Sequence, residues 1–178
     1  SITFTLIGYT EKNNFMKIDN AKPEDKIFIS GLIGESLLSR KNNKYHLPKL
    51  RNELGILLTN YANCCTDMSD GLLASLNNIT KQSNLGSKII INNIPISKNL
   101  KKKLEIENLT WQDILSYGED YELLFSVSRF KTEVLTKLCR DINFDIYEIG
   151  KFTEEKKSSF YNDDIRIELD MTKKFEHF

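Results

Sequence analysis

Residues 62–76 read ANCCTDMSDGLLASL, a stretch typical of a strand that turns directly into a helix. Small side chains fill its first half, and leucines recur at helical spacing in its second half. The turn between the two halves contains Asp67, Ser69 and Asp70. The stretch therefore predicts a strand that ends at Asp67, followed by a helix whose start carries polar side chains.

The polar residues of this turn allow two interpretations. The exposed N–H groups and the positive dipole at a helix start suit an anion such as phosphate. Two carboxylates would repel a phosphate unless a divalent cation lay between, so Asp67 and Asp70 predict Mg²⁺ if the ligand is a phosphate. The alternative is simple capping, in which Ser69 or Asp70 holds the first turn of the helix. The residues by themselves leave both interpretations open.

A second acidic stretch, residues 117–127, reads YGEDYELLFSV. Alternation in a strand would place Tyr121 and Leu123 on one face, with Glu122 and Leu124 on the other. Acids directly before a buried strand can bind a cation or a ligand rich in hydrogen-bond donors, or they can simply terminate a helix and a turn. The pattern does not choose between these roles.

Strand and helix patterns alternate along the rest of the chain. Strands are expected within residues 26–30, 88–92, 121–128, 145–152, 158–162 and 165–170, and helices within 32–40, 50–58, 72–82, 98–108, 109–118 and 131–141. In the last helix Val134, Leu135 and Leu138 share one face. This alternation predicts the α/β or α+β class.

The composition excludes several classes of protein. The 178 residues carry 25 basic and 25 acidic side chains, which removes the broad basic surface of a typical duplex-binding protein. No apolar run approaches the roughly 20 residues that a membrane helix needs. We therefore expect neither nucleic acid nor a membrane among the partners. Cys64, Cys65 and Cys139 lack the spacing of a disulfide framework or a metal site, so we expect three reduced thiols in a cytoplasmic protein.

The chain opens on SITFTLIGYT, in which Ile2, Phe4 and Leu6 alternate with threonines. This alternation predicts a strand. Because a domain seldom begins in the middle of a strand, we expect a fragment, a processed product or an edited chain, and the composition does not choose between them.

Together the two acidic stretches resemble a known family. TDMSDGLLASL and, further along the chain, YGEDYELLFSV are similar to the D-I-S-D-G-L and G-G-E-D-Y-E-L-L-F motifs of the thiamine-monophosphate kinases. The turn AKPED and the ending FEHF agree in order with the A-K-P-G-D and Y-D-H-F of that family. The resemblance covers essentially the whole chain. The GEDYELLF string separates it from the wider PurM-like superfamily, which shares the fold.

The resemblance implies a PurM-like C-terminal domain of the α/β (α+β) class, with helices packed against a mixed sheet. Residues 21–178 would form this domain, and residues 1–20 would be the closing strand and linker of a missing N-terminal domain. In the family, that N-terminal domain holds further metal-binding aspartates and a turn for nucleotide phosphates, and it forms the homodimer. We therefore expect the chain alone to be inactive.

Members of the family transfer the γ-phosphoryl group of ATP to thiamine monophosphate, in line and with several Mg²⁺ ions, giving thiamine diphosphate. Such a reaction needs positioning and charge neutralisation, so no separate catalytic residue is expected. By position, Asp67 and Asp70 match metal ligands and Ser69 matches a nucleotide contact. Glu119 matches a contact to the thiamine part of the substrate.

The chain departs from the family at two positions. The nucleotide-contacting arginine falls at or beside Ile18, where Lys17 supplies the only charge and lacks the bidentate fork of arginine. The aromatic residue that covers the ring system of the substrate falls at Thr172, with Phe175 as the nearest replacement. The intact motif makes the C-terminal domain of a genuine kinase the preferred hypothesis. These departures speak for a second hypothesis, a non-catalytic remnant that only folds or binds a partner. A third, another PurM-like enzyme that uses ATP on a different substrate, is weakened by the GEDYELLF string.

Overall fold

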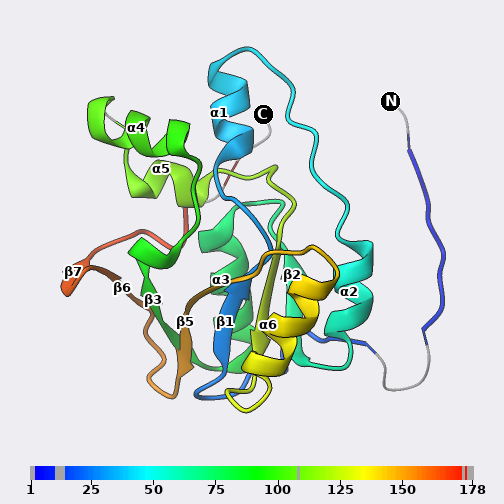
Figure 1. The fold of residues 1–178 in the computed structure, drawn as a ribbon. Helices are drawn as coiled ribbons and strands as arrows, with labels where there is room; N and C mark the ends of the chain where they lie inside the picture. The colour runs from blue at the N-terminus through cyan, green and yellow to red at the C-terminus, as the bar shows by residue number, and fades with distance from the viewer. Residues whose placement is uncertain (1–2, 11–14, 108, 174, 176–178) are drawn as a thin grey trace.

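A mixed sheet organises the computed structural model, which describes residues 3–10, 15–107, 109–173 and 175 (Figure 1). Its seven strands run in the order β2-β4-β1-β5-β3-β6-β7, and only the β3–β6 pair is parallel. The strands are β1 (Lys26–Ile29), β2 (Ala62–Asp67), β3 (Gly86–Ile90), β4 (Leu123–Val127), β5 (Tyr147–Thr153), β6 (Ser159–Asn162) and β7 (Ile165–Ile167). The expected α/β class with a mixed sheet is confirmed.

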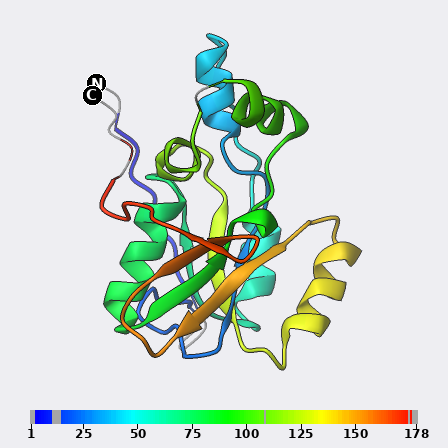
Figure 2. The same cartoon turned by 90° about the vertical axis from the view of Figure 1, so that its left-hand side faces the viewer.

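Helices cover both faces of this sheet, and Figure 2 shows α3 and α6 on opposite sides of it. The helices are α1 (Glu35–Lys41), α2 (Asn52–Leu58), α3 (Leu72–Ser83), α4 (Lys98–Ile106), α5 (Trp111–Ser116) and α6 (Thr132–Asp141), with a short 3₁₀ turn, η1 (Ile91–Asn93). They lie close to the intervals that the apolar periodicity predicts. The two short helices expected after β3 are α4 and α5.

Alternation along the strands divides the core in two. In β1, Ile27 and Ile29 face the larger cluster, which contains the apolar side of α3, while Phe28 faces the smaller cluster beneath α2 and α6. In β4, Leu124 and Phe125 divide in the same way. The central strands β1 and β4 are therefore buried on both faces.

Three local expectations are corrected by the structure. The strand expected at the start of the chain is absent over residues 3–10, where Phe4 and Leu6 are 86% and 95% exposed; Ile2 lies outside the described residues. Alternation alone cannot make a strand, because a strand needs a neighbour to accept its backbone hydrogen bonds. In α6, Val134 is exposed and the buried positions are Leu135 and Cys139, four residues apart.

The third correction concerns Tyr121, which lies outside β4 and has a φ of +52°. The face-to-face alternation expected from Tyr121 onward therefore begins only at Leu123.

The three cysteines are free, as expected, and Cys64 lies in β2 with its side chain fully buried. Burial raises the pKa of the Cys64 thiol to about 11. Within the described ranges, no helix has the length and apolar character needed to cross a membrane.

Candidate functional site

The first acidic turn, residues 67–71, connects β2 to α3. Asp67 is the last residue of β2, and Gly71 precedes α3 with a φ of +94°. A Cβ at Gly71 would lie 2.9 Å from the carbonyl oxygens of Ser116 and Tyr117, so only glycine fits here. The hydroxyl of Ser75 donates to the Asp67 carbonyl oxygen at 3.0 Å, which ties the first turn of α3 to the end of β2.

The side chains of this turn are not used to cap the helix. Gly71 occupies the N-cap position, and no side chain makes a capping hydrogen bond there. The capping interpretation of Ser69 and Asp70 is therefore wrong, because the chain enters α3 through a glycine that follows both residues. Among the described residues, the side chains of Asp67, Ser69 and Asp70 make no hydrogen bond or ion pair.

The second acidic turn, residues 118–122, lies directly against the first. The Glu119 N–H donates to the Ser69 carbonyl oxygen at 2.9 Å, and the Met68 N–H donates to the Glu122 carbonyl oxygen at 2.9 Å. Gly118 allows this approach, because a Cβ on it would overlap the Ser69 carbonyl oxygen. Two backbone hydrogen bonds thus bring the acids of both motifs to one end of the sheet.

Phe175 joins this group from the end of the chain. Its N–H lies 3.4 Å from the carbonyl oxygen of Asp70, and its ring lies 4.5 Å from the ring of Tyr117 at an angle of 54°. The remaining residues of the FEHF ending, 176–178, lie outside the described residues. The structure therefore places an aromatic side chain beside both acidic turns.

Thr172 precedes Phe175 on an exposed turn. Its hydroxyl donates to a carboxylate oxygen of Asp170 at 2.6 Å. The Asp170 N–H in turn donates to the side chain of Gln112 in α5 at 2.7 Å. Thr172 is thus held in a local turn along α5, and its hydroxyl already has an acceptor.

Lys17 lies away from the first acidic turn. Its ammonium group is 5.5 Å from the ring of Phe15, and the carbonyl oxygen of Ile18 is within 3.4 Å of the hydroxyl of Ser83. Ser83 is the last residue of α3, a helix of 12 residues and therefore about 18 Å long. The structure places Lys17 beside the end of α3 that is remote from the first acidic turn.

Two acids of the second turn have structural partners that the sequence did not reveal. Asp120, 3% exposed, accepts the N–H groups of Gly34 at 2.7 Å and Ser36 at 3.0 Å, at the start of α1. Burial raises the pKa of the Asp120 carboxyl group, and the bonds from Ser36 and Gly34 oppose that rise.

Glu122 forms a partly buried ion pair. It accepts the Ser30 hydroxyl at 2.6 Å and the Nε of Arg51 at 2.7 Å, and the Nη2 of Arg51 contacts its other oxygen. The alternation of β4 indicated that Glu122 would share a face with Leu124. No local signal pointed to Arg51, which lies 71 residues away along the chain.

The carboxylates of Asp67 and Asp70 are of the type that binds a hard cation. Asp67 is exposed and Asp70 is half-buried. Carboxylate oxygens are the protein ligands that Mg²⁺ prefers, usually one or two of them beside water and phosphate oxygens. The described part of the chain contains no group of three or more histidine, cysteine, aspartate or glutamate side chains that could hold a metal. Mg²⁺ at this turn would therefore need ligands in addition to these two aspartates.

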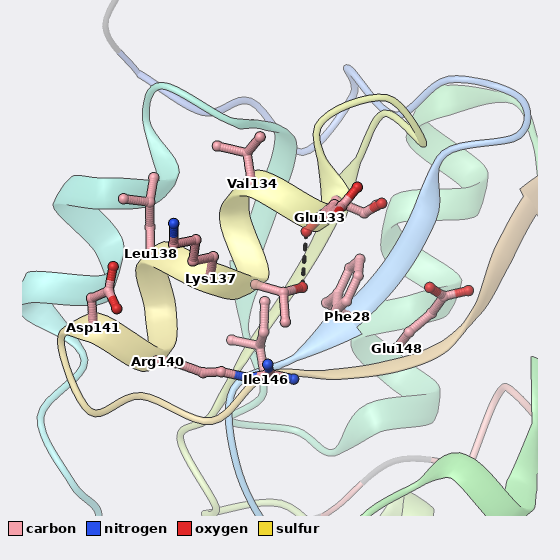
Figure 3. A pocket seen from close by; sticks show the side chains of 11 residues that line it. Phe28, Glu133, Val134, Lys137, Leu138, Arg140, Asp141, Ile146 and Glu148 are labelled. Atoms are coloured by element: carbon pink, nitrogen blue, oxygen red, sulfur yellow. Dashed lines mark hydrogen bonds between the residues drawn. The ribbon is translucent and has the colours of Figure 1, made fainter.

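A cavity of about 1060 Å³ lies away from the two acidic turns, between α6 and strands β1 and β5 (Figure 3). Phe28 and Ile146 contribute apolar surface, and Glu133, Lys137 and Arg140 contribute charged side chains. Its lining includes no residue of either acidic turn. This cavity and the acids of the two turns are therefore separate features.

Comparison with known proteins places this arrangement in context. The sequence model for the AIR synthase related protein, C-terminal domain, matches residues 23–162. The thiamine-monophosphate kinase of Buchnera aphidicola subsp. Schizaphis graminum is 40% identical over 175 residues, covering 88% of this chain and 54% of that protein. The thiamine-monophosphate kinase of Escherichia coli K12 is 30% identical over 197 residues, covering 100% of this chain and 60% of that protein.

Solved structures agree with these relatives. The thiamine monophosphate kinase of Aquifex aeolicus superposes with a TM-score of 0.69 at 27% identity, covering 90% of this chain and 56% of that one. The structure of AaThiL complexed with AMPPCP and TMP has a TM-score of 0.68 at 26% identity, covering 92% of this chain and 54% of that one. Escherichia coli HypE, at 16% identity and a TM-score of 0.73, shares the fold. The chain spans between 54% and 60% of the length of the two curated relatives above.

The contact between the two turns predicts a large effect of Gly118→Ala. The new Cβ would overlap the Ser69 carbonyl oxygen and press on the ring of Phe175, so we expect a loss of about 2–3 kcal/mol in the free energy of unfolding. Urea denaturation followed by circular dichroism measures this change.

Gly55→Ala is the matched control. Gly55 lies inside α2 with no atom within 4 Å of an added Cβ, so this substitution should stabilise the chain by about 0.5–1 kcal/mol. Equal stability of Gly118→Ala and the unmodified chain would show that the two turns do not depend on this contact.

Proposed function

We propose that this chain is the C-terminal domain of a thiamine-monophosphate kinase. The chain belongs to the family described as "AIR synthase related protein, C-terminal domain". The complete enzyme would transfer the γ-phosphoryl group of ATP to thiamine monophosphate. One observation carries the proposal. The fold uses Asp120 and Glu122 internally, yet it leaves the side chains of Asp67, Ser69 and Asp70 without a partner among the described residues, in a turn bonded to Glu119.

Each residue of this group has a role that its chemistry suits. Asp67 and Asp70 would hold Mg²⁺, whose charge neutralises phosphate oxygens during phosphoryl transfer. The Ser69 hydroxyl can donate to a phosphate oxygen of the nucleotide. The carboxylate of Glu119 can accept a hydrogen bond from the amino group of the thiamine moiety, and it favours the cationic thiazolium ring nearby. No side chain of the chain is assigned as a nucleophile, because positioning and charge neutralisation suffice.

The aromatic contact to the substrate would fall to Phe175. Thr172 has no ring and its hydroxyl is bound by Asp170, whereas the ring of Phe175 already lies beside Tyr117 and Gly118. Lys17 stays a prediction as a nucleotide contact. To reach a nucleotide held at Ser69, it would have to come from a second copy of the chain or change its place relative to α3.

The rest of the enzyme would be supplied by a further domain. Two aspartates provide too few ligands for several Mg²⁺ ions, and the relatives are longer than this chain. We propose that an N-terminal domain completes the metal and nucleotide sites, that the complete protein is a homodimer, and that it acts in the cytoplasm. A non-catalytic remnant is the second candidate, favoured by the loss of the aromatic residue at Thr172.

The chain by itself should not form thiamine diphosphate. With ATP, Mg²⁺ and thiamine monophosphate, we expect no product above the no-protein blank, because in this proposal a further domain supplies part of the metal and nucleotide site. Chromatography of the thiamine phosphates measures this. The protein extended by the sequence encoded upstream of Ser1 is the positive control. Robust turnover by the chain alone would contradict the inactivity, and an inactive extended protein would favour the remnant.

Substitution of the two aspartates tests the metal role. Asp67→Asn and Asp70→Asn should each weaken Mg²⁺ binding to the chain at least about tenfold, as measured by isothermal titration calorimetry. Since neither carboxylate holds the fold, each variant should change the free energy of unfolding by less than about 0.5 kcal/mol.

Asp164→Asn is the control for this experiment, because Asp164 is an exposed acid in the turn between β6 and β7. Its Mg²⁺ affinity should equal that of the unmodified chain. If all three variants bind Mg²⁺ equally well, the metal is held elsewhere or only diffusely, and the assignment of Asp67 and Asp70 fails.

A further inference from the structure

The start of α1 is fastened to the second acidic turn by a group of buried hydrogen bonds. The Ser36 hydroxyl lies 2.6 Å from the Gly118 carbonyl oxygen and 2.8 Å from a carboxylate oxygen of Asp120. The other carboxylate oxygen of Asp120 accepts the Gly34 N–H at 2.7 Å. Ser36 and Asp120 are each 3% exposed. Water is thus excluded from a contact that joins segments 82 to 86 residues apart in the chain.

This contact replaces the cap that α1 lacks in its own sequence. The N-cap residue is Gly34, with a φ of +80° and no side-chain capping bond. The N–H groups at a helix start need acceptors when they are buried. Asp120 supplies them, and a carboxylate is favoured there by the helix dipole. These hydrogen bonds therefore fix the position of Asp120 as well as the start of α1.

The residues on either side of Asp120 have an unfavourable backbone conformation. Glu119 has a φ of +67° and Tyr121 a φ of +52°, values that cost residues other than glycine about 1 kcal/mol or more each. Such a conformation persists only where neighbouring contacts enforce it. Here the neighbours are Gly118, whose carbonyl accepts from Ser36, and Asp120 itself.

We propose that Ser36 and Asp120 are positioning residues that fix the direction of Glu119 and, through Gly118, the place of the first acidic turn. They touch neither substrate nor metal in this proposal. Ser36 holds the carbonyl of Gly118, Gly118 packs on Ser69, and the Glu119 N–H bonds to Ser69. What Glu119 binds rests on the proposed function, whereas the mechanical link from α1 to the two acidic turns does not.

Native-state hydrogen exchange of the ¹⁵N-labelled chain tests the link. Ser36→Ala should speed exchange of the Glu119 amide at least about tenfold, while the amide of Phe125 in the middle of β4 keeps its protection. Ser87→Ala is the matched control, because Ser87 is equally buried and bonds to Ser158 in another part of the sheet. It should leave the Glu119 amide unchanged. Asp120→Asn, which loses an acceptor for α1, should act in the same direction as Ser36→Ala.

Two results would overturn the proposal. In the first, Ser36→Ala leaves Glu119 as protected as Ser87→Ala does. In the second, exchange at Glu119 and Phe125 rises by the same factor, so that the contact serves only global stability. A second measurement, the Kd for thiamine monophosphate with Mg²⁺ present, should rise about tenfold in Ser36→Ala and not in Ser87→Ala. If the unmodified chain binds no thiamine monophosphate, substrate binding by this domain alone fails, while the exchange result still decides the positioning role.

Discussion

The carbonyl oxygen of Ser69 occupies the space that a side chain at position 118 would fill, and the rest of the site depends on this close backbone approach. It allows the Glu119 N–H to reach Ser69, and it places Phe175 against the same glycine. Two motifs that are far apart in the chain thereby meet at one end of the sheet. A single added methyl group at Gly118 would collide with the Ser69 carbonyl oxygen and oppose this approach.

The acids of the two motifs then divide into two groups by their surroundings. Asp120 and Glu122 are buried, and each is held by donors from a distant segment. Asp67 is exposed and Asp70 is half-buried, and neither carries such partners among the residues that the structure describes. Buried acids without donors would cost several kcal/mol, so the first group serves the fold. The second group is the one that we propose to hold a cation beside a phosphate ligand.

Local signals were sufficient to predict the strand–turn–helix at residues 62–76 and most other elements, because periodicity and turn residues act within a few positions. The same signals failed at the start of the chain, where Phe4 and Leu6 alternate but find no neighbouring strand among the described residues. They also could not separate Asp120 from Asp67. The partners of Asp120 lie 84 and 86 residues away, and only the folded arrangement reveals them.

Chemical-shift mapping on the ¹⁵N-labelled chain tests whether the two acidic turns form one ligand site. Mg²⁺ and then thiamine monophosphate would be added at millimolar concentration. We expect the largest amide shifts on Ser69, Asp70, Gly118 and Glu119 together. Shifts that gather instead around the cavity beside α6, or that affect one turn and leave the other unchanged, would contradict it.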